Sequence, residues 1–119
     1  MPWERLLPES ALAPGAMTRV FAAGKPVLVA RARDGRLFAA DDACPHAGAP
    51  LHRGALAGTR VSCYLHLAAF DLAEEGRMVR TGGIGTVALR TFPVKVEEGH
   101  VWADVPEGRP PLPGALRPR

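Results

Sequence analysis

The sequence predicts an all-β protein, built as a small antiparallel sandwich or barrel with a cluster-binding subdomain. Two observations carry this prediction. Short apolar and β-branched runs recur along the chain, and glycine-containing turns separate them at regular intervals. The sole helix candidate is one short turn around residues 8–12. Such a pattern is typical of many short antiparallel strands packed in layers.

The expected elements follow in chain order. Asp34-Gly35 is a strong signal for a two-residue hairpin turn, and Gly24-Lys25-Pro26, Glu75-Gly76 and Glu98-Gly99 are further turns. Between the turns we expect strands at 17–22, 27–33, 36–40, 60–62, 69–72, 77–80, 86–95 and 100–105. Within the long strand at 86–95 and its extension, Phe92, Val94 and Val96 alternate and are expected on one face.

The length of 119 residues indicates a single domain, which we place at residues 1–105. Residues 106–119 form a tail with five of the twelve prolines, so we expect an extended conformation of polyproline II type. Leu112 and Leu116 could anchor this tail on the domain.

Charge and hydropathy exclude several classes of protein. The isoelectric point is about 9.4. However, residues 1–108 carry 12 basic and 12 acidic side chains, and the net +3 comes from Arg109, Arg117 and Arg119. This distribution argues against nucleic-acid binding. No apolar run is long enough to span a bilayer and no signal peptide opens the chain, so we expect no membrane association and a reducing cytoplasm.

Both cysteines and two of the four histidines occur in two short motifs. Cys44-Pro45-His46 is separated by sixteen residues from Cys63-Tyr64-Leu65-His66. Two thiolates and two imidazoles suit a metal centre, either zinc or a two-iron cluster with cysteines on one iron and histidines on the other. The alternative is that the four residues are incidental. His52 and His100 are off this spacing, and we expect both at the surface.

At these motifs the chain resembles the Rieske [2Fe-2S] family, whose signature is C-x-H followed by C-x-x-H. The stretches at 44–51, 70–72, 33–36 and 94–99 also fit, so the resemblance covers roughly residues 3–105. It implies one [2Fe-2S] cluster held by Cys44, His46, Cys63 and His66, in loops at about 44–52 and 63–70. It also implies that Pro45, Pro50, Leu51 and Leu65 shield the cluster from water.

The sequence departs from the family pattern at two places. Leu67 stands where the family usually has glycine, so the second loop must turn without that residue or follow another route. The stretch at 81–85 is glycine-rich where the family tends to carry proline, so we expect a less rigid segment there.

The resemblance further points to a low-potential subgroup. High-potential members carry two extra cysteines, at the positions of Ala49 and Leu65, and hydroxyl donors at the positions of Ala68 and Phe70. Hydrogen bonds to cluster sulfur raise the reduction potential, so their absence lowers it.

The function implied is one-electron transfer without catalysis, as the ferredoxin component that carries electrons from a reductase to a terminal oxygenase. The alternative is the small Rieske subunit of an NAD(P)H-dependent nitrite reductase. An oxygenase catalytic chain would need a second iron domain, for which 119 residues leave no room.

The composition also indicates a thermophile. The chain has no Asn or Gln, and it has 13 Arg against 2 Lys and 12 Pro. A GC-rich genome is the alternative explanation, and it accounts less well for the missing Gln.

Overall fold

The computed structural model describes residues 3–45, 48–65, 67–82 and 85–106. Its strands form three antiparallel sheets. The first holds β1 (Trp3–Pro8), β11 (His100–Asp104) and β10 (Val94–Glu97). The second holds β2 (Met17–Ala22), β3 (Lys25–Arg31), β4 (Leu37–Asp41) and β9 (Thr91–Phe92). The third holds β5 (Ala55–Ala57), β6 (Arg60–Ser62), β7 (Ala69–Asp71) and β8 (Arg77–Arg80). The all-β prediction is therefore confirmed.

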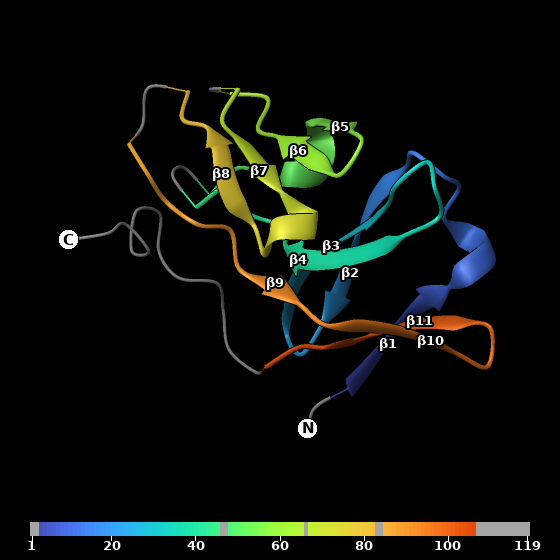
Figure 1. Ribbon diagram of the computed structural model, residues 1–119. Helices are drawn as coiled ribbons and strands as arrows, with labels where there is room; N and C mark the ends of the chain where they lie inside the picture. Colours follow the sequence, from blue (N-terminus) through green and yellow to red (C-terminus); the bar gives the residue numbers. More distant parts are fainter. Residues whose placement is uncertain (1–2, 46–47, 66, 83–84, 107–119) are drawn as a thin grey trace.

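The three sheets are arranged as layers, with the β2–β3–β4–β9 sheet between the other two (Figure 1). Strand β3 shows why. Val27 and Val29 belong to the core shared with β11, whereas Leu28 and Ala30 belong to the core shared with β6 and β7. A strand buried on both faces is apolar at every position instead of at alternate ones, which explains the continuous run at 27–30.

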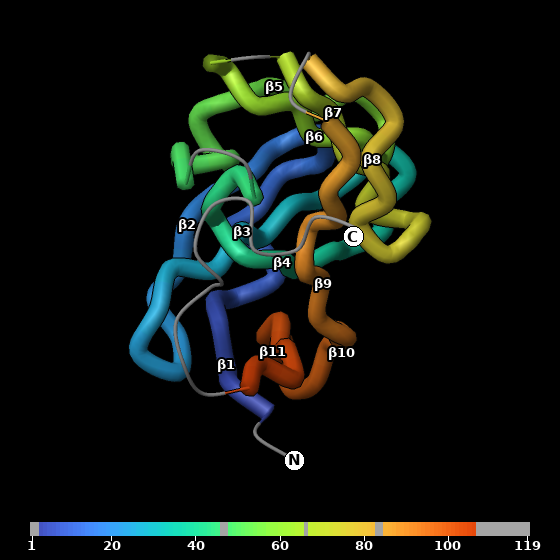
Figure 2. The backbone as a smooth tube through the Cα atoms, turned by 90° about the vertical axis from the view of Figure 1, so that its left-hand side faces the viewer, coloured from blue at the N-terminus to red at the C-terminus, as the bar shows by residue number. Residues whose placement is uncertain are grey.

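The first and last strands lie side by side at the end of the molecule away from the β5–β8 sheet (Figure 2). β1 pairs with β11 from Trp3↔Asp104 to Pro8↔His100, with one irregularity between Arg5 and Leu7. The first and last strands of the described chain therefore belong to the same sheet. Among the described residues, no helix is long and apolar enough to cross a membrane.

Two expected elements are wrong in detail. The first hairpin turns at Ala23-Gly24, with φ of 53° and 77°, and Lys25 already pairs with Ala22. Residues with positive φ at both central positions match the twist of the flanking strands, and this preference outweighed the turn signal of Pro26.

The expected long strand at 86–95 is also not one strand. β9 pairs with β4 and β10 pairs with β11, so the chain changes sheets at Pro93, which cannot donate a ladder hydrogen bond. Consequently Phe92 is buried, whereas Val96 is 46% exposed. The expectation that Phe92, Val94 and Val96 share one face of one strand is therefore wrong, because Phe92 lies in β9 and the two valines lie in β10 of another sheet.

The shorter features lie near the predicted positions. The helix candidate is a single 3₁₀ turn at Glu9–Ala11, and two more occur at Leu51–Arg53 (η2) and Leu72–Glu74 (η3). Strand β5 was not expected from the sequence, and it pairs with β6 across a turn at Gly58-Thr59.

The two-residue hairpin at Glu98-Gly99 forms as expected, with positive φ at both residues. The hairpin between β3 and β4 also forms, but the expected two-residue turn at Asp34-Gly35 is a three-residue loop at 33–35. The Gly35 N–H donates to the Ala32 carbonyl (2.9 Å), and the Ala32 N–H donates to the Arg36 carbonyl (2.8 Å).

Candidate cluster-binding site

The two predicted ligand loops have the same backbone hydrogen bonds. The Cys44 N–H donates to the Ala49 carbonyl (2.8 Å), and the Gly48 N–H donates to the Cys44 carbonyl (2.7 Å). In the second loop, the Cys63 N–H donates to the carbonyl five residues on, at Ala68 (2.8 Å). The N–H four residues on, at Leu67, donates to the Cys63 carbonyl (2.9 Å). Each cysteine is thus held at the start of the same small turn.

Both turns require a left-handed residue at the same position. Gly48 has φ of 75° and Leu67 has φ of 61°. Glycine takes this conformation without steric cost, whereas a residue with a β-carbon takes it only at a cost in free energy. Leu67 therefore adopts the glycine conformation itself, and the second loop keeps the geometry of the first.

The bases of the two loops pack against each other through backbone. A β-carbon placed on Gly54, just after the first loop, would lie 1.7 Å from the carbonyl oxygen of Ser62. Ser62 directly precedes Cys63. Glycine at position 54 therefore permits the close approach that brings the two cysteine-bearing loops together.

The cysteines lie in a dry environment. Cys44 is 1% exposed and Cys63 is 0% exposed, and no disulfide joins them. Both belong to one apolar cluster whose other members include Leu51, Ala68 and Val87. Two buried thiols on matching turns fit a thiolate-ligated group, because thiolates bind soft or borderline metals and apolar surroundings exclude water.

The two predicted histidine ligands, His46 and His66, lie outside the described residues. Within the described part of the chain, no group of three or more metal-ligating side chains gathers. The residues expected to shield the cluster differ in burial. Leu51 is fully buried, Pro45 and Pro50 are partly buried, and Leu65 is 54% exposed.

The second loop is braced from β8. The Arg80 Nε donates to the Leu67 carbonyl at 2.6 Å, and its Nη2 lies 3.2 Å from the Ser62 hydroxyl oxygen. These contacts tie the strained residue and the strand before Cys63 to one guanidinium. The sequence carried no signal for this contact, because it joins residues thirteen and eighteen positions apart.

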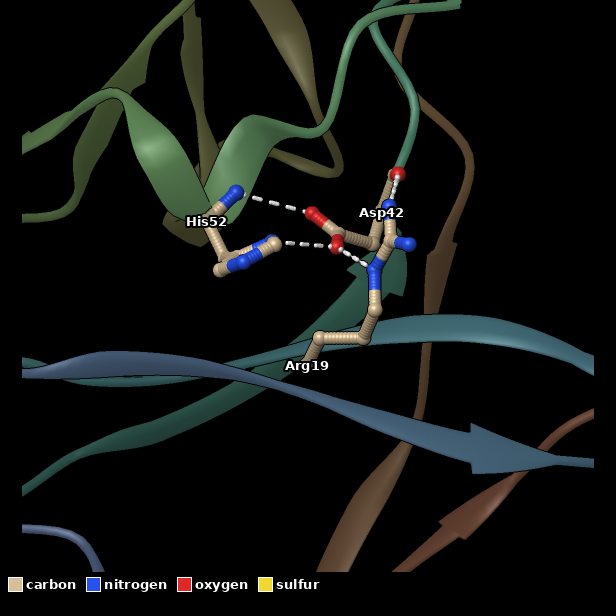
Figure 3. A network of polar contacts seen from close by, with 3 residues as sticks. All are labelled: Arg19, Asp42 and His52. Carbon is tan, nitrogen blue, oxygen red and sulfur yellow. Dashed lines mark hydrogen bonds and ion pairs between the residues drawn. The ribbon is translucent and has the colours of Figure 1, made fainter.

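A histidine also supports the first loop (Figure 3). His52 was expected at the surface; its side chain is 28% exposed, but it also contacts a buried carboxylate that the sequence did not indicate. The His52 N–H donates to Asp42 Oδ1 at 2.8 Å, and its Nδ1 lies 2.7 Å from Asp42 Oδ2. Arg19 of β2 also pairs with Asp42 Oδ2, and its Nη2 donates to the Asp42 carbonyl at 3.2 Å. Asp42 is fully buried, and three of these four contacts, two from His52 and one from Arg19, compensate the charge of its carboxylate. His100 is partly exposed and contacts the Glu98 carbonyl.

Two other buried ionisable groups support the scaffold. The Thr59 hydroxyl donates to Asp71 at 2.6 Å, which lowers the pKa of the Asp71 carboxyl against the opposing effect of burial. Burial lowers the pKa of the Lys25 ammonium, and the charge of Arg90 lowers it further. Lys25 Nζ has no hydrogen-bond partner in the described part of the chain and lies 5.0 Å from the centre of the Phe92 ring.

The second loop also presents apolar side chains to solvent. Tyr64, Leu65 and Leu67 are 47%, 54% and 60% exposed. They are three of the five large hydrophobic residues that are exposed within the described segments. An exposed apolar group beside a candidate metal centre is typical of a surface that binds another protein.

The fold and site define a class of protein: a β domain with two matching cysteine loops whose buried thiols suit a metal centre. Residues 2–93 match the family model described as the Rieske [2Fe-2S] domain. The chain belongs to the Rieske [2Fe-2S] family, and the group that this family carries is one [2Fe-2S] cluster.

Similar proteins are named as ferredoxins of oxygenase systems. The chain is 40% identical over 101 residues to the ferredoxin component of biphenyl 2,3-dioxygenase from Rhodococcus jostii, covering 82% of this chain and 87% of that protein. It is 38% identical over 79 residues to the 3-phenylpropionate/cinnamic acid dioxygenase ferredoxin subunit of Photorhabdus laumondii, covering 62% and 69%.

Solved structures agree. One is a complex of reduced oxygenase and oxidized ferredoxin in carbazole 1,9a-dioxygenase, with a TM-score of 0.76, 33% identity and coverage of 86% and 92%. The structure of a putative nitrite reductase small subunit has a TM-score of 0.72 over 88% of this chain and all of that one. At 21% identity this likeness concerns the fold alone.

Proposed function

We propose that this protein is a one-electron carrier whose [2Fe-2S] cluster is held by Cys44, His46, Cys63 and His66. It serves as the ferredoxin component that takes electrons from a reductase and delivers them to a terminal oxygenase. The observation that carries the ligand assignment is the identical hydrogen bonding of the two turns that begin at Cys44 and Cys63. Two buried cysteines in equivalent turns are the arrangement that one shared metal centre requires.

The donor set determines the chemistry that the group supplies when bound, which is transfer of one electron at a time. Neutral imidazole in place of anionic thiolate on one iron raises the reduction potential. The residues of this chain set the surroundings. Ala68 and Phe70, both fully buried, present no hydroxyl donor, so we place the potential at the low end of the Rieske range.

We propose that the exposed side chains of Tyr64, Leu65 and Leu67 form the contact surface for redox partners. They flank His66 in the sequence, and burying them would exclude water at the point of transfer. The oxygenase is favoured as acceptor because the similar proteins named above are ferredoxins of dioxygenases. The nitrite reductase alternative has only a likeness of fold in its favour.

We further propose that residues 1–105 form the single domain, since β11 pairs along β1, and that 106–119 are a tail. The absence of Asn and Gln supports a thermophilic source, and two cysteines in no disulfide support a reducing cytoplasm. A melting midpoint of about 50 °C for the holoprotein would contradict the thermophilic source.

Metal analysis and ligand substitution test the assignment. The purified protein should be red-brown and contain two irons and two acid-labile sulfides per chain. Cys44→Ser and His66→Ala should lose the colour and destabilise the fold, because cluster binding and folding are coupled. His100→Ala, outside the proposed ligand set, should keep the colour and the stability of the wild type. One zinc per chain without labile sulfide would refute the assignment.

Electron delivery is tested separately. The reduced protein should reoxidise rapidly when mixed with a Rieske terminal oxygenase and its aromatic substrate. Leu65→Ser and Leu67→Ser should slow this step while leaving the absorption spectrum unchanged. Equal reoxidation of the wild type and both variants would refute the proposed contact surface. Reoxidation only by nitrite reductase would favour the alternative function.

A further inference from the structure

The two ligand loops are closed at their bases by different means. The second loop leaves β6 at Ser62 and enters β7 at Ala69, and these two residues are paired in the sheet. The first loop leaves β4 at Asp41, and the chain next enters the 3₁₀ turn η2 at Leu51 instead of a strand that pairs with β4. No ladder therefore joins the two ends of the first loop within the described residues.

Side chains replace that ladder. The Asp42 carboxylate, at one end of the loop, accepts from the backbone N–H and from the ring of His52, at the other end (2.8 and 2.7 Å; Figure 3). A carboxylate only accepts hydrogen bonds, so the proton of the second bond lies on His52 Nδ1. Arg19 attaches the same carboxylate to β2.

We infer that Arg19, Asp42 and His52 form a clamp that positions the first ligand loop, and that His52 is a positioning residue for Cys44. The inference rests on the proposed function for its link to the cluster. The clamp joins residues ten apart, and the loop between them carries Cys44 and His46. Without the clamp, that segment would sample other conformations. Cluster binding would then have to order it, at a cost in conformational entropy that weakens binding.

The burial of the clamp supports a role beyond surface attraction. Asp42 has no exposed side-chain area, and the side chains of Arg19 and His52 are each 28% exposed. A hydrogen bond to a buried charge is stronger than a surface ion pair, and loss of one donor leaves the carboxylate partly uncompensated. Groups that hydrogen-bond metal ligands change metal affinity by about 10- to 100-fold, and the clamp acts one step further out, on the segment that carries Cys44.

Two amide substitutions separate this role from simple packing. The side-chain nitrogen of Asn takes the place of His Nδ1, whereas that of Gln takes the place of Nε2. His52→Asn therefore keeps the donor to Asp42, and His52→Gln removes it from that position. His100→Gln is the matched control, because among the described residues the ring of His100 contacts the Glu98 carbonyl two residues away and no buried carboxylate.

The first measurement is release of iron from the oxidised holoprotein to a chelator. We expect His52→Gln to release iron at least about tenfold faster than the wild type. His52→Asn should stay within about threefold of it, and His100→Gln should match it. The electron paramagnetic resonance lines of reduced His52→Gln should also broaden. Equal rates in wild type and His52→Gln, or equally fast release from both His52 variants, would overturn the inference.

The second measurement does not depend on the cluster. Hydrogen exchange of the Cys44 and Gly48 amides, which close the first turn, should become about tenfold faster in His52→Gln. Exchange at Cys63 and Leu67, the equivalent amides of the second turn, should stay unchanged. Equal acceleration in both loops would mean a general loss of stability and would overturn the clamp. Wild-type protein without labile sulfide would instead refute the proposed function, and the exchange data would still decide the clamp.

Discussion

The left-handed conformation of Leu67 can be tested by comparing it with Leu65. Both are leucines of the second ligand loop with similar exposure, 60% and 54%. Leu67 has a positive φ of 61°, whereas Leu65 does not have a positive φ. Replacing either with glycine removes a similar partly buried side chain and adds similar backbone entropy. The difference between the two substitutions therefore isolates the strain.

The expected magnitude follows from three contributions. Losing less than half of a leucine's burial costs about 1 kcal/mol, and glycine adds about 0.5–1 kcal/mol of backbone entropy. Relief of the left-handed strain returns about 1–2 kcal/mol, at position 67 only. Leu67→Gly should thus be nearly neutral, and Leu65→Gly should destabilise by about 1.5–2 kcal/mol. At about 4 °C per kcal/mol, the midpoints should differ by about 4–8 °C.

The assay is thermal unfolding of the holoprotein, followed by circular dichroism and by cluster absorbance. A β-branched pair gives a check of opposite sign, because such residues are the least suited to positive φ. Leu67→Ile should destabilise, and Leu65→Ile should change little. If both glycine variants lost the same stability, the second turn would not have the conformation of the first.

Three further predictions concern the potential and the scaffold. The wild-type midpoint should lie between about −150 and 0 mV, and Ala68→Ser and Phe70→Tyr should each raise it by tens of millivolts in a spectroelectrochemical titration; a wild-type value above about +150 mV would contradict the subgroup. Thr59→Ala should reduce stability at pH 7 by about 1.5–3 kcal/mol, since it removes a hydrogen bond to a carboxylate. The folded pKa of Asp71 is lowered, so its stabilisation is present above the unfolded value of about 3.9 and lost as pH falls through the folded pKa. Denaturant titrations from pH 7 to 2 should therefore show a smaller loss in the variant, and equal losses would exclude Thr59 as the cause. Lys25→Met should raise the stability at pH 7, because the ammonium is buried without a hydrogen bond in the described structure; a less stable variant would mean that its contact with an aromatic ring outweighs burial.

Several features of the fold were predictable because neighbouring residues decide them. The turn at Glu98-Gly99 forms where short-range chemistry placed it, and β6 has the expected bounds, Arg60–Ser62. Positive φ at the second residue of a tight turn is easiest for glycine, so the signal is local. The two cysteine motifs were likewise visible as spacing alone.

Other features depend on contacts between distant residues. The chain changes sheets at Pro93, because the residues before it pair with β4 and the residues after it pair with β11. No local signal in the sequence indicates which strand each half pairs with. The role of His52 was missed for the same reason. Nothing in the spacing of the histidines predicts that His52 contacts the buried carboxylate of Asp42, ten residues earlier.

The sequence by itself determined the class of this protein, because ligand type and spacing are written in two short motifs and strand content in local turns. Only the tertiary structure decided how the motifs become a site. The repeated turn is visible only once the backbone places Leu67 in the conformation of Gly48. The clamp on the first loop exists only because β2, β4 and η2 converge on Asp42. Burial and hydrogen-bond partners of this kind are set by packing between segments far apart in the chain, which residue order alone does not express.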